Sequence, residues 1–171
     1  MRDTVSGRDF DQYLTFRIDE GQYAFRVDTV REVIEYTKIT RLPRMSETMR
    51  GVINIRGAVI PVFDLKLLFG MGRTQEATDT SIIVLEIRGS RNLAAVGVLT
   101  DSVQEVIRLD PGAVEPPPTL GRSAVSRAVS RAVTGIGKLG DEFVAILDID
   151  ELLGETGEEL HAAEAAVAEA V

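Results

Sequence analysis

Alternation of apolar and polar residues predicts short β-strands along most of the chain, because side chains two residues apart lie on one face of a strand. The first alternating runs are Leu14, Phe16 and Ile18, followed by Tyr23, Phe25 and Val27. Between them, Asp19–Gly21 predicts a three-residue hairpin loop in which the glycine supplies a positive φ. The chain therefore opens with a predicted β-hairpin.

Further strand patterns follow in both halves of the chain. The clearest are 52–56, 58–63, 81–87, 93–99 and 143–147. The first two are joined at Arg56-Gly57 as a second hairpin. Pro61 has no N–H for a β-ladder, so we expect it at a sheet edge or a bulge. The near-continuous apolar character of the later strands indicates burial on both faces.

The predicted helices are short and begin at aspartates that can serve as N-caps. After Asp28 and Asp101 come apolar residues at helical spacing: Val30, Val33 and Ile34, then Val103, Val106 and Ile107. Asp64 is expected to cap a turn that ends at Gly70. Asp148 is expected to cap a second turn that ends at Gly154, with Glu151 at the capping-box position.

The chain also repeats itself. D-T-V-R-E-V-I from Asp28 returns as D-S-V-Q-E-V-I from Asp101, and the block from Gly51 to Gly70 aligns without a gap with the block from Gly135 to Gly154. Two blocks in the same order indicate two similar subdomains, with approximate halves 10–70 and 80–154. Short strands at regular spacing favour two small barrels, since closure removes exposed sheet edges.

Three segments lie outside the repeat. Residues 71–79 form a polar connector, and 109–134 contain Pro116–Pro118 followed by a Val/Ser/Arg run that predicts either a short amphipathic helix or a mobile loop. The alanine- and glutamate-rich tail, 155–171, has high helix propensity but a thin apolar stripe of Leu160, Val167 and Val171. We expect this tail to be helical or flexible, and to fray more than it docks.

Composition narrows the possible functions. The formal net charge is −8 and only 5% of residues are aromatic, which disfavours a nucleic-acid-binding barrel with a basic face and stacking aromatics. There is no cysteine, which excludes disulfides, thiolate metal sites and thiol nucleophiles. Residues 1–11 lack the apolar run of a signal peptide and no stretch could span a bilayer, so we expect a cytoplasmic protein without membrane insertion.

Candidate catalytic chemistry is sparse. The single histidine, His161, lies in the tail, which makes triads and multi-histidine metal sites poor interpretations. Residues 135–140 match G-x-G-x-x-G, but a strand pattern follows where a dinucleotide site needs a helix, so we interpret them as a glycine-containing turn. Asp148–Glu151 lacks the central glycine of a calcium loop, and helix capping explains Asp148 better. No enzyme, metal or cofactor is predicted, although an enzyme with perturbed acids in a polar pocket stays an alternative.

These motifs together resemble the CheW family. The resemblance rests on Glu32-Val33, Pro43, the G-V-I-N-I-R-G run from Gly51 to Gly57, Pro61 and Asp64-Leu65, and in the second half on Gly97, Asp101, Val103, Val106 and Thr134–Gly137. It covers roughly residues 10–154. Ile55 replaces the family's usual leucine, and the elongated 109–134 connector and the acidic tail lie outside the pattern.

The resemblance implies an all-β fold of two small five-stranded SH3-like barrels packed together, with a few short helices and a groove between them. It implies an adaptor that couples the cytoplasmic signalling tips of chemoreceptors to the regulatory domain of the histidine kinase CheA, at receptor arrays. A CheW-like adaptor of a non-flagellar chemosensory pathway is the alternative. At 171 residues, the chain has no room for the further domains of a CheA kinase or of CheV.

Eight residues are candidates for specific roles. By the resemblance, Glu32 and Arg56 lie near the receptor-facing groove, and we expect them to form an ion pair that holds its shape. Val30, Val33 and Val103 are candidate apolar anchors for a receptor helix, although any one valine could equally be core. Gly51, Gly57 and Gly135 are expected to serve turn geometry or close packing.

Overall fold

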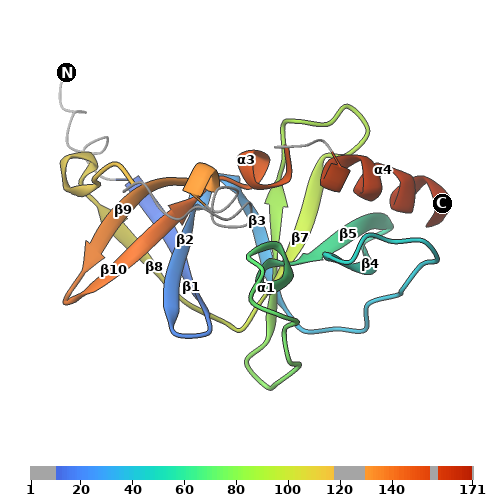
Figure 1. Ribbon diagram of the computed structural model, residues 1–171, viewed down its shortest axis with the longest axis horizontal. Coiled ribbons are helices and arrows are strands. Elements are labelled where there is room, and N and C mark those ends of the chain that lie inside the picture. Colours follow the sequence, from blue (N-terminus) through green and yellow to red (C-terminus); the bar gives the residue numbers. More distant parts are fainter. Residues whose placement is uncertain (1–10, 118–129, 155–157, 171) are drawn as a thin grey trace.

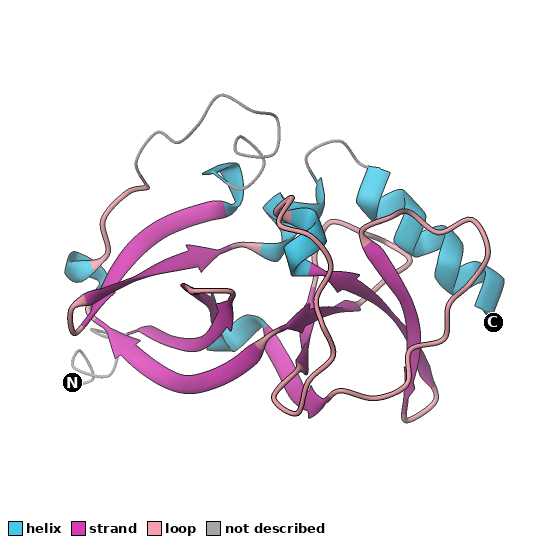
Figure 2. Cartoon of the chain, turned by 60° about the horizontal axis from the view of Figure 1, so that its bottom comes forward, coloured by secondary structure: helices cyan, strands magenta, loops and turns pink. Residues whose placement is uncertain are grey.

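The computed structural model describes residues 11–117, 130–154 and 158–170. Their strands form two five-stranded sheets, each curled into a small barrel, which lie side by side (Figures 1 and 2). Barrel 1 contains, in spatial order, β8 (Ser102–Leu109), β1 (Asp11–Ile18), β2 (Gly21–Arg26), β10 (Glu142–Leu147) and β9 (Val133–Leu139). Barrel 2 contains β3 (Val30–Glu35), β6 (Ser81–Glu86), β7 (Ala95–Thr100), β5 (Ala58–Asp64) and β4 (Met49–Ile55). The all-β prediction of two five-stranded barrels is confirmed.

The sequence halves do not correspond to the barrels. The chain builds β1 and β2 in barrel 1 and crosses to barrel 2 through a 3-10 turn, η2 (Val27–Thr29). It crosses back between β7 and β8, at Asp101. Each barrel therefore combines two strands of one half with three of the other, so neither 10–70 nor 80–154 forms a barrel by itself.

Both helical turns predicted after Asp28 and Asp101 are wrong, because these segments form the edge strands β3 and β8. A bulge explains the misleading spacing. Val30 pairs with Leu85 and Val33 pairs with Ile83, so one extra residue lies between them on β3. A bulge places residues three apart on the same side of a strand, which imitates the period of a helix.

The helices that follow β5 and β10 were predicted correctly. Asp64 caps α1 (Leu65–Leu68) by accepting hydrogen bonds from the N–H groups of Lys66 and Leu67, and Gly70 has a φ of 73°. Asp148 caps α3 (Ile149–Gly154) by accepting from Asp150 N and Glu151 N at 2.9 and 3.2 Å. These side chains satisfy N–H groups that have no partner inside the helix.

The hairpin turns differ in detail from the prediction. The β1–β2 loop has two residues, and Asp19, not Gly21, has the positive φ, at 52°. Gly21 pairs with Ile18 inside the ladder, where a Cβ would lie 2.9 Å from the Tyr23 ring. The β4–β5 turn at Arg56-Gly57 is as expected, with φ values of 49° and 88° that suit a tight hairpin.

Pro61 lies inside β5, between β7 and β4, not at an edge or a bulge. Its partner on β4 is Val52, whose N–H and C=O both bond to Thr40 on the other side. On the β7 side, pairing with β5 begins only at Val62. Neither neighbouring strand therefore needs the N–H that proline lacks.

Three hydrophobic clusters stabilise this arrangement. One fills barrel 2, with Ile60, Ile82 and Val84 among its members, and another fills barrel 1, around Tyr13 and Ile107. The largest lies between the barrels and joins Phe16 and Phe25 of barrel 1 to Phe63 and Leu85 of barrel 2. Because the cluster with the most buried residues joins the barrels, we expect them to fold as one unit.

The C-terminal segment docks, contrary to the expectation that it frays. Helix α4 (Glu158–Ala170) lies against β4 and β5, with Ala163 and Ala166 buried and Leu160 and Val167 packed on the inter-barrel core (Figure 1). The apolar stripe looked thin because alanines supply much of the contact. Residues 155–157 and 171 lie outside the described residues, as does most of the Val/Ser/Arg run, of which 130–132 are helical.

Candidate docking surface

The predicted pair of Glu32 and Arg56 forms. Arg56 Nη2 donates to Glu32 Oε2, joining edge strand β3 to the β4–β5 hairpin. The arginine side chain is 77% exposed and the glutamate 28%. Asn54 Oδ1 accepts from Gly57 N at 3.0 Å and closes the turn that presents Arg56. An exposed pair of this kind contributes only about 0–1 kcal/mol to folding.

Beside this ion pair lies an open depression of about 250 Å³ at the surface of barrel 2. Glu32 and Arg56 form part of its wall, together with Arg31, Ile55, Ala58, Ile60 and Val84. Ile60 and Val84 belong to the hydrophobic core of barrel 2. The depression is therefore an apolar floor with a charged rim.

The three candidate valines do not line this depression: Val30 and Val33 lie on β3, and Val103 lies on β8 of barrel 1. Val30 and Val103 are partly buried against the inter-barrel core, and Val33 is 40% exposed. Val33 pairs with Ile83, a member of the inter-barrel core, whereas Glu32 pairs with Val84, a member of the barrel 2 core. On β3, therefore, Glu32 and Val33 lie on opposite faces of the strand, and Val103 lies on β8 of the other barrel.

Val106 belongs with the three candidate valines and was missed as a site residue. It is 52% exposed and pairs with Leu14 of the inter-barrel core. Val103 and Val106 occupy the same repeat positions as Val30 and Val33, 73 residues earlier. The repeat was thus the signal that could have found it. We call Val30, Val33, Val103 and Val106 the valine surface; barrel 2 supplies its first two members and barrel 1 its last two.

The three predicted glycines are needed for different reasons. Gly57 forms the hairpin turn. Gly51 lies in β4 with a φ of 149°, and a Cβ there would lie 2.3 Å from the carbonyl oxygen of Thr40. Gly135 is not in a turn but inside β9, where a Cβ would lie 2.5 Å from Val114 Cγ1. The G-x-G-x-x-G segment is thus a strand that ends at the turn residue Gly140, with no helix after it.

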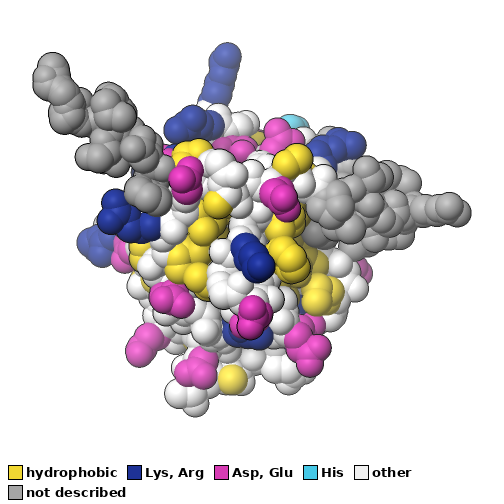
Figure 3. All heavy atoms as spheres, turned by 90° about the vertical axis from the view of Figure 1, so that its left-hand side faces the viewer, with side chains coloured by type: hydrophobic (Ala, Val, Ile, Leu, Met, Phe, Trp, Pro, Cys, Tyr) yellow, Lys and Arg dark blue, Asp and Glu magenta, His cyan; other side chains and the backbone are white. Residues whose placement is uncertain are grey.

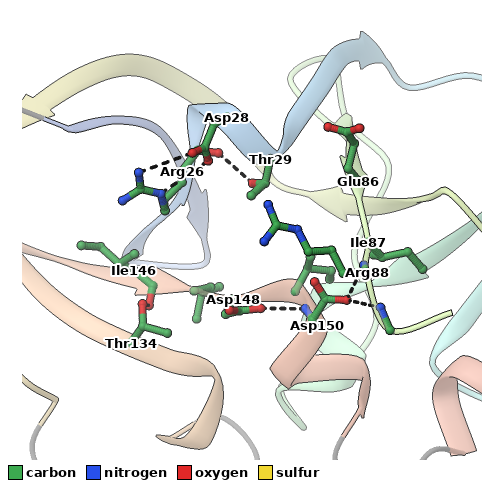
Figure 4. A pocket seen from close by; sticks show the side chains of 13 residues that line it. Arg26, Asp28, Thr29, Glu86, Ile87, Arg88, Thr134, Ile146, Asp148 and Asp150 are labelled. Atoms are coloured by element: carbon green, nitrogen blue, oxygen red, sulfur yellow. Dashed lines mark hydrogen bonds and ion pairs between the residues drawn. The ribbon is translucent and has the colours of Figure 1, made fainter. Parts of the chain in front are cut away.

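A further cavity lies between the barrels (Figure 4). It has a volume of about 700 Å³ and is lined from barrel 1 by Arg26, Asp28, Thr29, Thr134 and residues 146–150, and from barrel 2 by residues 86–89. Four of its lining residues are acidic, which makes it the place to look for catalytic chemistry.

Each of these acids already has a structural partner. Asp28 accepts from Arg26, and Glu86 lies 3.7 Å from the Arg31 guanidinium. Asp148 caps α3, and Asp150 accepts from the backbone N–H groups of Arg88 and Gly89 (Figure 4). All four acids that line the cavity thus take part in contacts with neighbouring residues.

Within residues 11–117, 130–154 and 158–170, no group of three or more His, Asp or Glu side chains could hold a metal ion. In the same ranges, no helix combines the length and apolarity that a membrane span requires.

The outer end of barrel 1 is a further exposed apolar area. Figure 3 shows apolar side chains across the middle of this face, with acidic side chains and some basic ones among and around them. Phe143 on β10 is 64% exposed and follows the β9–β10 turn, which points away from barrel 2 (Figure 1).

Comparison with known proteins agrees with this architecture. Residues 12–157 match the family model for the CheW-like domain. The chain is 30% identical to the chemotaxis protein CheW of Klebsiella aerogenes, over 83% of this chain and 81% of that one. It is 33% identical to CheW of Thermotoga maritima, over 84% and 88%.

A solved structure gives the same result. The crystal structure of the scaffolding protein TtCheW from Thermoanaerobacter tengcongensis superposes with a TM-score of 0.75 at 34% identity, covering 87% of this chain and 96% of that one. With the duplicated barrels, the Glu32–Arg56 pair and the matched length in view, the chain belongs to the CheW family of chemotaxis adaptor proteins.

Proposed function

We propose that this chain couples the signalling tips of chemoreceptors to the regulatory domain of the histidine kinase CheA, and that it acts within receptor arrays. The observation that carries the receptor part is the valine surface. It exposes Val33 and Val106 on edge strands of two different barrels, each opposite a residue of the core that joins them. An amphipathic helix has an apolar stripe of the kind that such a surface accepts.

The Glu32–Arg56 pair forms a charged border at the depression of barrel 2, on the face of β3 opposite Val33. From there its charges can orient a receptor helix without occupying the apolar contact. Charges at the rim of an interface contribute mainly to orientation and to the rate of association.

An adaptor needs a second surface for its second partner. The outer end of barrel 1, with the exposed Phe143, is the place that we propose for the kinase domain. It points away from barrel 2, so a protein bound there leaves the junction between the barrels accessible. Individual contacts can be weak because an array supplies many of them at once.

The proposed activity is assembly and involves no bond-making step. Receptor and kinase held on one rigid body allow a movement of the first to shift the conformational equilibrium of the second. In the inter-barrel cavity, all four lining acids have a hydrogen-bond or ion-pair partner, which supports this non-enzymatic role.

A binding assay with a purified receptor signalling domain tests the charged border. Arg56→Glu places two carboxylates together, and we expect receptor affinity to fall by about tenfold while the unfolding temperature stays near that of the wild type. The double variant Glu32→Arg/Arg56→Glu should recover much of the loss. The control is Arg91→Glu, at an exposed arginine of the β6–β7 loop. Unchanged receptor affinity in Arg56→Glu contradicts the role given to this pair.

The same assay with the CheA regulatory domain tests the second surface. Phe143→Asp should weaken kinase binding and leave receptor binding unchanged. If Phe143→Asp binds both partners as the wild type does, the kinase surface lies elsewhere.

A further inference from the structure

The two barrels are joined by polar contacts as well as by the apolar core, and these contacts follow the repeat. Lys66 on α1 and Asp150 on α3 occupy the same position of the repeated block that runs from Gly51 and from Gly135. Both helices lie at the junction of the barrels (Figure 1). Each directs the equivalent residue to a loop of the opposite barrel.

Lys66 makes the first contact. Helix α1 follows β5 of barrel 2, and Lys66 Nζ lies 2.7 Å from Asp19 Oδ1 in the β1–β2 turn of barrel 1. It also lies 3.7 Å from Asp101 Oδ2, where the chain crosses from barrel 2 to barrel 1. Asp101 Oδ2 in turn accepts from Asp19 N at 2.7 Å. The lysine side chain is only 12% exposed, so this contact is better shielded from solvent than an ordinary surface pair.

The positive φ of Asp19, 52°, belongs to the same contact. This backbone conformation is unusual for a residue other than glycine. In this conformation the Asp19 N–H donates to the Asp101 carboxylate, and the Asp19 carboxylate pairs with the Lys66 ammonium group. The hydrogen bond to Asp19 also raises the pKa of Lys66 above its ordinary value, so the lysine is charged throughout the neutral range.

Asp150 makes the second contact, and its charge is opposite to that of Lys66. Helix α3 follows β10 of barrel 1, and Asp150 Oδ1 accepts from Arg88 N at 2.8 Å and from Gly89 N at 3.0 Å, in the β6–β7 loop of barrel 2 (Figure 4). A carboxylate that accepts two backbone N–H groups forms strong, directional hydrogen bonds. Lys66 thus reaches from barrel 2 to barrel 1, and Asp150 reaches from barrel 1 to barrel 2.

We propose that Lys66, with Asp19 and Asp101, and Asp150 are positioning residues that fix the angle between the barrels and so set the separation of the two halves of the valine surface. The physical reason is that the apolar core between the barrels attracts without direction, whereas hydrogen bonds and ion pairs have preferred geometry. Val33 belongs to barrel 2 and Val106 to barrel 1, so their separation depends on that angle. The predicted effect on receptor binding rests on the proposed role of the valine surface. The predicted effect on the angle between the barrels does not.

Distance measurements between spin labels test the structural content without any partner. The chain has no cysteine, so Glu35→Cys on β3 and Gln104→Cys on β8 give two unique labelling sites, both exposed. In this background, Lys66→Met and Asp150→Ala should each shift or broaden the distribution of label separations. Lys66→Arg, which keeps the charge, should restore it. The controls are Lys38→Met and Asp79→Ala, at exposed side chains outside the junction.

Receptor binding by the same variants without labels tests the consequence. We expect Lys66→Met and Asp150→Ala each to lower receptor affinity by about fivefold, the size of a modest coupling between sites, with a single cooperative unfolding transition retained. An unchanged separation distribution in both variants overturns the positioning role, whatever the affinity does. A changed distribution with unchanged affinity, in a wild-type chain that binds receptor, overturns the link to docking. If the wild-type chain binds no receptor tip, the proposed function fails, and the distance measurement alone still decides whether the contacts position the barrels.

Discussion

Strands β3 and β8 come from the two copies of one repeated sequence block. They occupy equivalent positions in the two barrels, but different side chains surround them. Each is the edge strand of its barrel, and each has a bulge at the same point, with Arg31-Glu32 opposite Val84 and Gln104-Glu105 opposite Thr15. The valines keep equivalent positions in both copies. The glutamates do not keep equivalent partners.

Glu32 bonds to Arg56 on the neighbouring hairpin, and Val84 lies opposite its bulge. At the bulge of β8, by contrast, the hydroxyl of Thr15 donates to Glu105 O at 2.9 Å and accepts from Glu105 N at 3.2 Å. The hairpin that corresponds to Arg56-Gly57 reads Gly140-Asp141 and has no arginine.

The comparison teaches how a duplicated scaffold can be specialised. The apolar pattern, which builds the edge strands and the valine surface, is retained in both copies. The ion pair with the hairpin has no counterpart at Gly140-Asp141, because it depends on an arginine that this hairpin lacks. Three pairs of variants at equivalent positions test how far the two barrels have diverged.

The largest contrast is expected at the two capping aspartates. Asp64 is fully buried and bonds Arg50, Thr74 and the start of α1, whereas Asp148 is half-buried and caps α3. Asp64→Ala leaves the buried Arg50 guanidinium without this carboxylate, so we expect a loss of about 3–5 kcal/mol in the free energy of unfolding. Asp148→Ala should cost about 1 kcal/mol. Urea denaturation measures both, and equal losses would show that the Asp64 cluster adds nothing beyond capping.

The next contrast concerns the glycines at the start of each repeated block. Gly51→Ala places a methyl group 2.3 Å from a backbone oxygen in a backbone conformation that disfavours side chains, and we expect a loss of about 3 kcal/mol or more. Gly135→Ala meets the end of the Val114 side chain, which can rotate, so about 1–2 kcal/mol is expected. Thermal unfolding followed by circular dichroism ranks the two. A larger loss for Gly135→Ala would contradict this account of the close approach.

The smallest contrast is at the bulges. Thr15→Val removes both hydrogen bonds to Glu105 and should cost about 1–2 kcal/mol. The reciprocal variant, Val84→Thr, adds a hydroxyl beside the barrel 2 core and should cost about 1–3 kcal/mol unless it bonds the Glu32 backbone in the same way. A neutral Val84→Thr would therefore reveal that the two bulges are still interchangeable. Chemical denaturation of both variants gives the comparison.

The sequence by itself determined the class of fold, most strand positions and the family. Period-two apolar patterns, tight-turn residues and capping aspartates act within a few residues of each other, so their consequences can be read locally. The pair of Glu32 and Arg56 could also be predicted, since the resemblance placed both beside one groove.

Only the tertiary structure decided which strands share a barrel. The exchange of strands between the halves is set by the crossovers at Val27–Thr29 and Asp101, and no local pattern records where a chain goes after a turn. The bulges turned an apparent helical spacing into edge strands, because the partner strands β6 and β1 satisfy the backbone there. The docking of α4 and the contacts of Lys66 and Asp150 likewise arise between residues far apart in sequence, where burial and geometry outweigh local propensity.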